Sequence, residues 1–249
     1  MSTADVTKSF TGAGMIVDGR AIPEDESITF ANGRQNAVDV LIGSNKDEGS
    51  FNTRLPTAAQ WTEQIHDRWK DLADALLKLY PHATDAEAGA SSQAIFSDEM
   101  AWHMRRYAQA QAAIGKKAYL YYFTREPPTE PGKTNLRATH TAEIPYVFNN
   151  LKAVRVYPDA SSPELSSASE ADRKLADIVS SYWVNFARTG DPNGKGLAQW
   201  PQYKDKASGR AMILGDAQQP ESRVATARFD LFDALYARQL AATRAGPVQ

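Results

Sequence analysis

Two residues of the sequence, Glu48 and His140, have side chains that serve in acid–base chemistry and occupy comparable positions. Glu48 lies six residues after Ile42, where an apolar run ends, and His140 lies in a proline-rich loop that follows another apolar run. In a hydrolytic triad, a carboxylate accepts a hydrogen bond from one imidazole nitrogen, and the other nitrogen takes the proton of a serine hydroxyl. The pair predicts the acid and base of such a triad. From position alone, a solvated loop acid and a structural histidine stay open as alternatives.

The other three histidines do not predict a metal centre. His66, His82 and His103 have no metal-ligand spacing, either with one another or with His140, and the sequence contains neither HExxH nor any cysteine. His66 and His103 lie inside helical patterns, and His82 follows Pro81 at a predicted helix end. We therefore expect these three to be surface or boundary residues.

The elements that must position Glu48 and His140 follow the rhythm of an α/β sheet. Apolar and aromatic runs predict strands at 38–42, 118–124 and 211–214. Apolar residues at three- and four-residue steps predict helices from Pro56 to Pro81, from Ser97 or Asp98 to Gly115, at 169–188, and through Phe229 to Leu240. Residues 1–37 are turn-rich. Because loops leaving successive parallel strands meet at one edge of a sheet, such a fold can bring Glu48 and His140 together.

The composition is that of an ordinary globular protein and narrows the function classes. The 249 residues are 42% hydrophobic and carry a formal net charge of -2, which gives no reason to expect nucleic acid or an anionic membrane as partner. No apolar run approaches the ~20 residues that span a bilayer. The N-terminus lacks the pattern of a secretory signal, and nothing indicates a compartment. Because no linker segment separates two folded regions, we expect residues 1–249 to form one domain or a piece of one.

Several segments, in a fixed order, resemble the type-B carboxylesterases, the group that includes cholinesterases and bacterial para-nitrobenzyl esterases. Gly43–Phe51 (GSNKDEGSF) resembles the family's acid-bearing motif, and His140–Phe148 (HTAEIPYVF) resembles its histidine motif. Tyr182–Asn193 (YWVNFARTGDPN), followed by Trp200–Tyr203 (WPQY), agrees with a third family segment, and Val17–Gly19 with the lead-in to the acid's strand. Four motifs in the family's order make the resemblance specific.

The resemblance implies the C-terminal part of an α/β-hydrolase fold, with Glu48 as the triad acid and His140 as the general base. The fold presents its serine in a G-x-S-x-G turn, which the sequence does not contain, and its oxyanion hole comes from sequence that precedes the matched part. We therefore expect the nucleophile half to be missing and the chain alone to be inactive. The implied substrate is a small-molecule carboxylic ester, with no metal or organic cofactor.

Two other hypotheses for the function of this chain stay open: a non-catalytic interaction module of the same fold, and a truncated inactive fragment. The presence of both Glu48 and His140 argues against the module. The missing half predicts an unpaired sheet edge with a large apolar patch near 38–42, and either self-association or an N-terminal half bearing G-x-S-x-G as partner. In the histidine motif, we expect Glu143 to hold the loop, while Tyr146 and Phe148 either border a substrate pocket or pack below it.

Overall fold

The computed structural model describes residues 16–129, 132, 134–151, 168–205, 209–222 and 227–245. They group into two compact units, one made of the residues up to Asn36 with those from Ala237 onward, the other of Ala37–Tyr236. The expectation of a single domain over residues 1–249 stays a prediction.

The described elements are, in order, α2 (Glu26–Ala31), β1 (Val40–Asn45), η1 (Glu48–Phe51), α3 (Ala58–Trp69), η2 (Lys70–Leu72), α4 (Ala73–Leu77), α5 (Asp85–Ala113), β2 (Ala118–Phe123), α6 (Ile144–Val147), α7 (Glu170–Thr189), β3 (Arg210–Leu214), β4 (Gln218–Ser222) and α8 (Ala227–Ala245).

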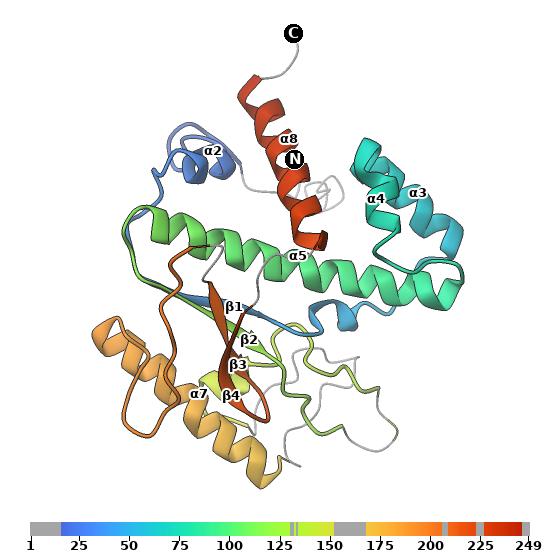
Figure 1. Ribbon diagram of the computed structural model, residues 1–249. Helices are drawn as coiled ribbons and strands as arrows, with labels where there is room; N and C mark the ends of the chain where they lie inside the picture. The colour runs from blue at the N-terminus through green and yellow to red at the C-terminus, as the bar shows by residue number, and fades with distance from the viewer. Residues whose placement is uncertain are drawn as a thin grey trace, which may run out of the picture. The chain divides into compact units, whose positions relative to one another are not determined.

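The larger unit is built on a mixed, mainly parallel sheet of order β1-β2-β3-β4 (Figure 1). β1 pairs with β2, and β2 with β3, in parallel, whereas β3 and β4 form an antiparallel hairpin. Gly43 permits a close approach of β1 to β2, because a Cβ built on it would lie 2.3 Å from the carbonyl oxygen of Tyr121. The predicted α/β architecture is therefore present.

Side chains alternate across the central strands, and each face of the sheet has its own helical cover. Ala118 and Leu120 of β2 lie in a core cluster with Ala108 of α5, together with Val40 of β1 and Ala211 of β3. The intervening residues face the other way. In Figure 1, α5 crosses one side of the sheet and α7 lies on the other. The strands are thus covered on both faces, as their nearly continuous apolar runs predict.

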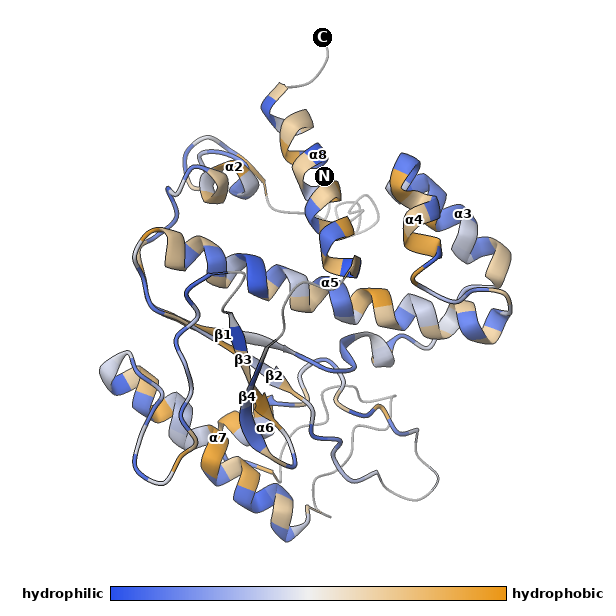
Figure 2. Ribbon diagram, in the orientation of Figure 1, coloured by the Kyte–Doolittle hydropathy of each residue, from blue (hydrophilic) through white to orange (hydrophobic). Residues whose placement is uncertain are grey.

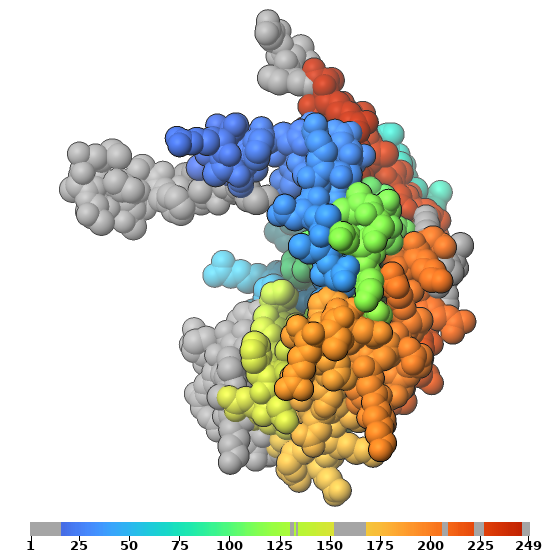
Figure 3. Space-filling model, turned by 90° about the vertical axis from the view of Figure 1, so that its left-hand side faces the viewer, coloured from blue at the N-terminus to red at the C-terminus, as the bar shows by residue number. Residues whose placement is uncertain are grey.

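α7 packs its apolar stripe on the face opposite α5. Leu175, Val179 and Tyr182 lie in one cluster with Tyr119 and Phe123 of β2, and the alternation of apolar and polar residues along α7 is visible in Figure 2. Ser169 caps its N-terminus, and Gly190 ends it in the left-handed conformation, at φ 69°. Figure 3 shows α7 and the segment after it on one face of the molecule. The hydroxyl of the buried Tyr182 joins the two, donating to the carbonyl of Ala198 at 2.7 Å.

A second core lies among α3, α4, α5 and the first part of α8. Trp69, Leu76 and Trp102 pack with Phe232, and the ring centroids of Trp69 and Phe232 are 5.3 Å apart. Asp233 accepts hydrogen bonds from the indole of Trp102 at 2.8 Å and from Arg105. The predicted tail helix is therefore confirmed. None of the helices in the described part of the chain combines the length and apolar character needed to cross a membrane.

The predicted start of the second helix is wrong. We expected Ser97 or Asp98 as the cap, but α5 begins twelve residues earlier, at Asp85. Thr84 and Glu87 form a reciprocal capping box there, which satisfies two free backbone N–H groups. Ser97 lies inside the helix, and its hydroxyl donates to the carbonyl of Gln93 at 3.0 Å.

Three other elements depart from the sequence-based expectations. The helix predicted from Pro56 to Pro81 is interrupted at Lys70, whose φ is 51°, and it divides into α3, η2 and α4. β4 was not predicted, since its sequence QQPES lacks an apolar pattern and contains Pro220; proline is tolerated in an edge strand. The turn-rich N-terminal region contains α2, which Asp25 caps.

β1 lies at one end of the sheet order, and within the described residues it is paired only with β2. The apolar residues at 38–42, where we expected a large apolar patch, differ in their exposure. Val38 is about half exposed and Val40 is buried, while Leu41 and Ile42 are partly exposed. Self-association through this edge stays a prediction.

Candidate active site at the carboxyl ends of β1 and β2

The sheet brings Glu48 and His140 to one edge. Glu48 opens η1, three residues after β1 ends at Asn45, and His140 lies in the loop between β2 and α6. Because β1 and β2 are parallel, with Asn45 opposite Phe123, both loops leave the same edge. Nδ1 of His140 lies 2.7 Å from Oε2 of Glu48, across 92 residues of sequence. The two residues singled out from the sequence are therefore hydrogen-bonded partners.

Hydrogen bonds join the acid loop to the histidine loop along their length. The backbone N–H of Asp47 donates to the carbonyl of Ala138 at 2.9 Å, and the hydroxyl of Ser50 donates to the carbonyl of Leu136 at 2.5 Å. Nε of Arg137 donates to the carboxylate of Asp47 at 2.7 Å. The two loops thus form one connected layer above the sheet edge, which limits how far Glu48 and His140 can move apart.

Glu48 is buried, and both of its carboxylate oxygens are bound. It is only 4% exposed; Oε1 accepts the backbone N–H of Asn45 at 2.7 Å, while Oε2 faces His140. Gly49 lets η1 lie directly on α5, since a Cβ there would be 2.3 Å from the carbonyl oxygen of Gln93. The backbone N–H of Gly49 donates to the hydroxyl oxygen of Ser97 at 3.1 Å. A buried carboxylate with two donors is held in one orientation.

His140 presents its other nitrogen to an open side. Its side chain is 41% exposed, and within the described residues no hydrogen bond occupies Nε2. When the imidazole is neutral, the carboxylate at Nδ1 favours the tautomer with hydrogen on Nδ1, which leaves Nε2 as a proton acceptor. Phe51 lies beside it, with ring centroids 6.0 Å apart, and stacks edge-on with Phe96 at 5.7 Å. The open nitrogen therefore has an aromatic wall on one side.

A second acid, the partly buried Glu143, lies next to this pair. Its Oε2 accepts a hydrogen bond from the side-chain amide of Asn45 at 2.5 Å, and Oε1 faces the hydroxyl of Tyr121 at 3.5 Å. Burial raises the pKa of Glu143; the Asn45 amide opposes that shift, while the charge of Glu48 adds to it. Burial, with the charges of Glu143 and Glu48, also raises the pKa of Tyr121, so the phenol stays a donor.

Asn45 was missed by the sequence analysis, although it contacts both acids. Its side chain is buried, and Nδ2 donates to the carbonyl of Thr139 at 2.7 Å as well as to Glu143. The available signal was its place three residues after the predicted buried strand 38–42 and three residues before Glu48, close to a sheet edge where a buried polar side chain requires partners.

Tyr146 packs below the site rather than bordering it. The residue is fully buried, and its hydroxyl donates to Asp172 at 2.9 Å. Nε of Arg125 donates to the same oxygen at 2.7 Å. Burial by itself would raise the pKa of Asp172, but donors from Arg125 and Ser169 outweigh it and lower that pKa to about 2. Phe148, in contrast, is largely exposed.

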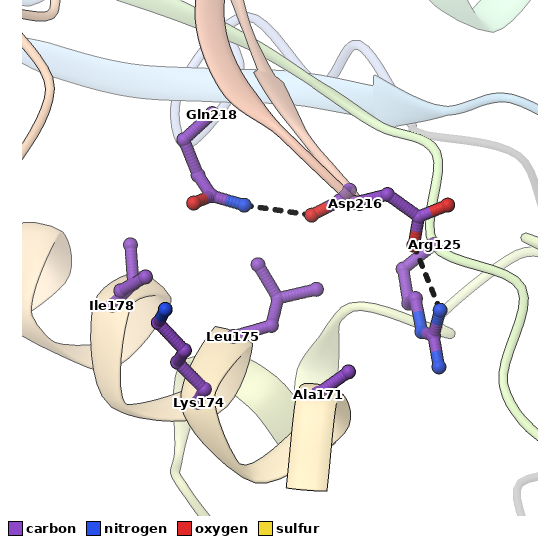
Figure 4. A pocket seen from close by; sticks show the side chains of 8 residues that line it. Arg125, Ala171, Lys174, Leu175, Ile178, Asp216 and Gln218 are labelled. Atoms are coloured by element: carbon purple, nitrogen blue, oxygen red, sulfur yellow. Dashed lines mark hydrogen bonds and ion pairs between the residues drawn. The ribbon is translucent and has the colours of Figure 1, made fainter. Parts of the chain in front are cut away.

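A separate cleft of about 390 Å³ lies between α7 and the β3–β4 turn (Figure 4). Leu175, Ile178 and Lys174 line it from α7, and Gln218 lines it from the opposite side, at the start of β4. Neither Glu48 nor His140 lines it. In the part of the chain that the structure describes, no three His, Cys, Asp or Glu side chains gather into a group that could hold a metal ion.

The serines nearest Glu48 in sequence are structural. Ser44 and Ser50 are both buried, and the hydroxyl of Ser50 is bound to the Leu136 carbonyl. Neither stands in a G-x-S-x-G sequence. Neither serine therefore contributes a free hydroxyl in the manner of that motif beside the Glu48–His140 pair.

Comparison with known proteins gives one consistent result. A model of the carboxylesterase family matches residues 2–232. Fumonisin B1 esterase of Sphingopyxis macrogoltabida is 32% identical over 206 residues, covering 81% of this chain and 37% of that protein. Para-nitrobenzyl esterase of Bacillus subtilis is 25% identical over 209 residues, covering 81% and 39%. The chain thus spans about two fifths of the length of these relatives.

A solved structure of a PNB esterase has the same fold as the described chain. The two superpose with a TM-score of 0.63 at 23% sequence identity, over 82% of this chain and 40% of that chain. This structural similarity confirms the predicted α/β-hydrolase fold class. Because the match covers 40% of the esterase chain, the described chain corresponds to one part of a longer fold.

Proposed function

This chain belongs to the carboxylesterase family, and we propose that it supplies the triad acid, Glu48, and the general base, His140, for hydrolysis of a small-molecule carboxylic ester. The observation that carries the proposal is the 2.7 Å bond between Nδ1 of His140 and Oε2 of Glu48, with Nε2 left open. A buried, doubly bound acid behind a half-open imidazole is the arrangement that general-base catalysis requires.

In the proposed mechanism, Nε2 of His140 takes the proton of a serine hydroxyl as its oxygen attacks the ester carbonyl. The imidazolium then protonates the departing alcohol, which leaves an acyl-enzyme. His140 next takes a proton from water, the hydroxide displaces the acyl group as a carboxylic acid, and the serine recovers its proton. Glu48 holds the imidazole in the required tautomer throughout and stabilises its positive charge.

The serine and the oxyanion donors have to come from sequence other than these 249 residues, which contain no G-x-S-x-G. We propose that a segment carrying that motif adds to the sheet at β1, whose outer edge has no described partner strand. A strand that pairs there in parallel would end on the same edge as Glu48 and His140. The chain by itself is then inactive, because an imidazole without a positioned serine and oxyanion hole lowers the barrier little.

The test is a rate assay with p-nitrophenyl esters on two samples. The first is the chain alone, and the second is the chain co-expressed with a carboxylesterase segment that bears G-x-S-x-G and ends where the matched region begins. We expect the first sample to match free imidazole, and the second to show turnover that a serine-directed inhibitor abolishes. Inhibitor-sensitive turnover by the chain alone would reveal a nucleophile within it. A stable, co-purifying pair without turnover would contradict the proposed function and favour a non-catalytic module.

A further inference from the structure

We propose that Asn45 is a positioning residue that fixes the orientation of His140 by tying the end of β1 to the histidine loop on both sides of the imidazole. This inference rests on the proposed function, since it assigns Asn45 a part in preparing the Glu48–His140 pair. Asn45 is 1% exposed, so its side chain acts on protein groups and not on solvent.

The contacts of Asn45 reach Glu48 and the chain on both sides of His140. Its backbone N–H donates to Oε1 of Glu48 at 2.7 Å. Its side-chain amide donates to the carbonyl of Thr139, the residue before His140, at 2.7 Å, and to the carboxylate of Glu143, three residues after His140, at 2.5 Å. One residue therefore holds the acid through its backbone and the histidine loop through its side chain.

The histidine loop has a conformation that requires such support. Thr141 adopts a φ of 70° and Arg137 a φ of 56°, and both values lie in the left-handed region that residues with a Cβ rarely occupy. This backbone conformation is especially costly for Thr141, a β-branched residue next to His140. The loop keeps this backbone conformation only where surrounding hydrogen bonds outweigh its energetic cost. The two hydrogen bonds from the Asn45 amide hold the loop on either side of His140 and Thr141.

The chemistry of the position demands an amide. Two acceptors, a carbonyl and a carboxylate, face the same nitrogen, and the NH₂ group of asparagine offers a hydrogen to each. Alanine would leave both acceptors without that donor. The Glu143 carboxylate would then lack its neutral partner 2.5 Å away, close to the charge of Glu48. We expect the loop to relax and the Nδ1 bond of His140 to loosen with it.

The test uses the 249-residue chain alone and reads the imidazole tautomer rather than activity. Long-range ¹H–¹⁵N correlation spectra report which ring nitrogen carries hydrogen in each neutral histidine, and His140→Gln identifies the His140 signals. We expect His140 of the native chain to carry its hydrogen on Nδ1. In Asn45→Ala, the ratio of the Nδ1–H to the Nε2–H form should fall roughly tenfold, the factor that follows from weakening one charge-assisted hydrogen bond.

Asn193→Ala is the matched control. Asn193 is a partly buried asparagine whose side chain ties together two points of the segment between α7 and β3, donating to Asp191 at 2.7 Å and accepting the N–H of Trp200 at 2.6 Å. It should lower the melting temperature without changing the tautomer of His140. A folded Asn45→Ala chain with an unchanged tautomer ratio overturns the role of Asn45 and leaves the proposed function intact. A native chain with its hydrogen on Nε2 of His140 overturns the proposed function itself.

If Asn45→Ala does not fold, the native chain still gives an answer through the side-chain amide protons of Asn45. We expect them to exchange with solvent at least ~100-fold more slowly than those of the exposed Asn52, because buried donors exchange only when the local structure opens. Exchange as fast as in Asn52 would overturn the inference.

Discussion

Nδ1 of His140 and Oε2 of Glu48 lie 2.7 Å apart, although 92 residues separate them in the sequence. Their proximity follows from the parallel pairing of β1 with β2, which sends the loops after both strands to one edge of the sheet. Glu48 is buried and His140 is partly exposed, so the carboxylate fixes one side of the imidazole and leaves the other side open. This relationship gives the following predictions.

Replacement of Glu48 by glutamine should damage turnover less than loss of His140. The amide keeps the volume of the carboxylate but removes the charge that fixes the tautomer and stabilises the imidazolium. In the reconstituted pair we expect kcat to fall by about 10²- to 10⁴-fold. Steady-state kinetics with p-nitrophenyl esters measure this, and a variant within twofold of the native kcat would show that Glu48 is not the triad acid.

Glu143→Gln should stabilise the chain at neutral pH. A carboxyl whose folded pKa is raised above 4.5 gives stability that is present below that value and lost as the pH rises through the folded pKa. Glutamine keeps the acceptor for Asn45 and removes the partly buried charge. We expect its melting temperature to exceed the native value by roughly 2–4 °C at neutral pH, with the difference vanishing at acidic pH. An advantage of the variant over the native chain that grows on acidification would contradict this prediction.

Asp172→Asn should destabilise the chain above the acidic range. The pKa of Asp172 is depressed to about 2, so its contribution is present above its unfolded value of 3.8 and disappears as the pH falls through the folded value. Removing the partner of the Arg125 guanidinium from a buried site should cost about 3–5 kcal/mol. Urea unfolding at neutral pH measures it. Equal stability of variant and native chain would mean that Arg125 and Tyr146 do not depend on this carboxylate.

Gly49→Ala should displace the acid loop. The new methyl group would meet the backbone carbonyl of Gln93 at 2.3 Å, and this backbone lies inside α5 and cannot move aside cheaply. We expect a loss of about 1–3 kcal/mol, together with a changed His140 tautomer. Gly89→Ala is the control, because its methyl would meet the end of the Leu55 side chain at 2.9 Å. If both variants cost the same, the close approach of η1 to α5 does not hold Glu48 in place.

The sequence predicts the pairing of Glu48 with His140 and the sheet better than it predicts what supports them. β2 and α7 were placed within a residue or two, because long apolar or amphipathic runs are decided by burial. The start of α5 was misplaced, since Thr84 and Glu87 lie ahead of its apolar stripe and Ser97 can either cap a helix or sit within one. The role of Asn45 was not predicted because its partners, Thr139 and Glu143, are distant in sequence and become neighbours only through the sheet.

The most direct test of the central claim compares two histidine variants in the reconstituted pair. His66 is the control, since its side chain is 48% exposed and its Nε2 lies 3.7 Å from Asp74, which resembles His140 in exposure and in having an acidic neighbour. The measurement is kcat/KM for a p-nitrophenyl ester. We predict that His140→Ala lowers it by roughly 10⁴- to 10⁶-fold, while His66→Ala leaves it within about twofold. Retained turnover in a folded His140→Ala pair would contradict the assignment of His140 as the general base.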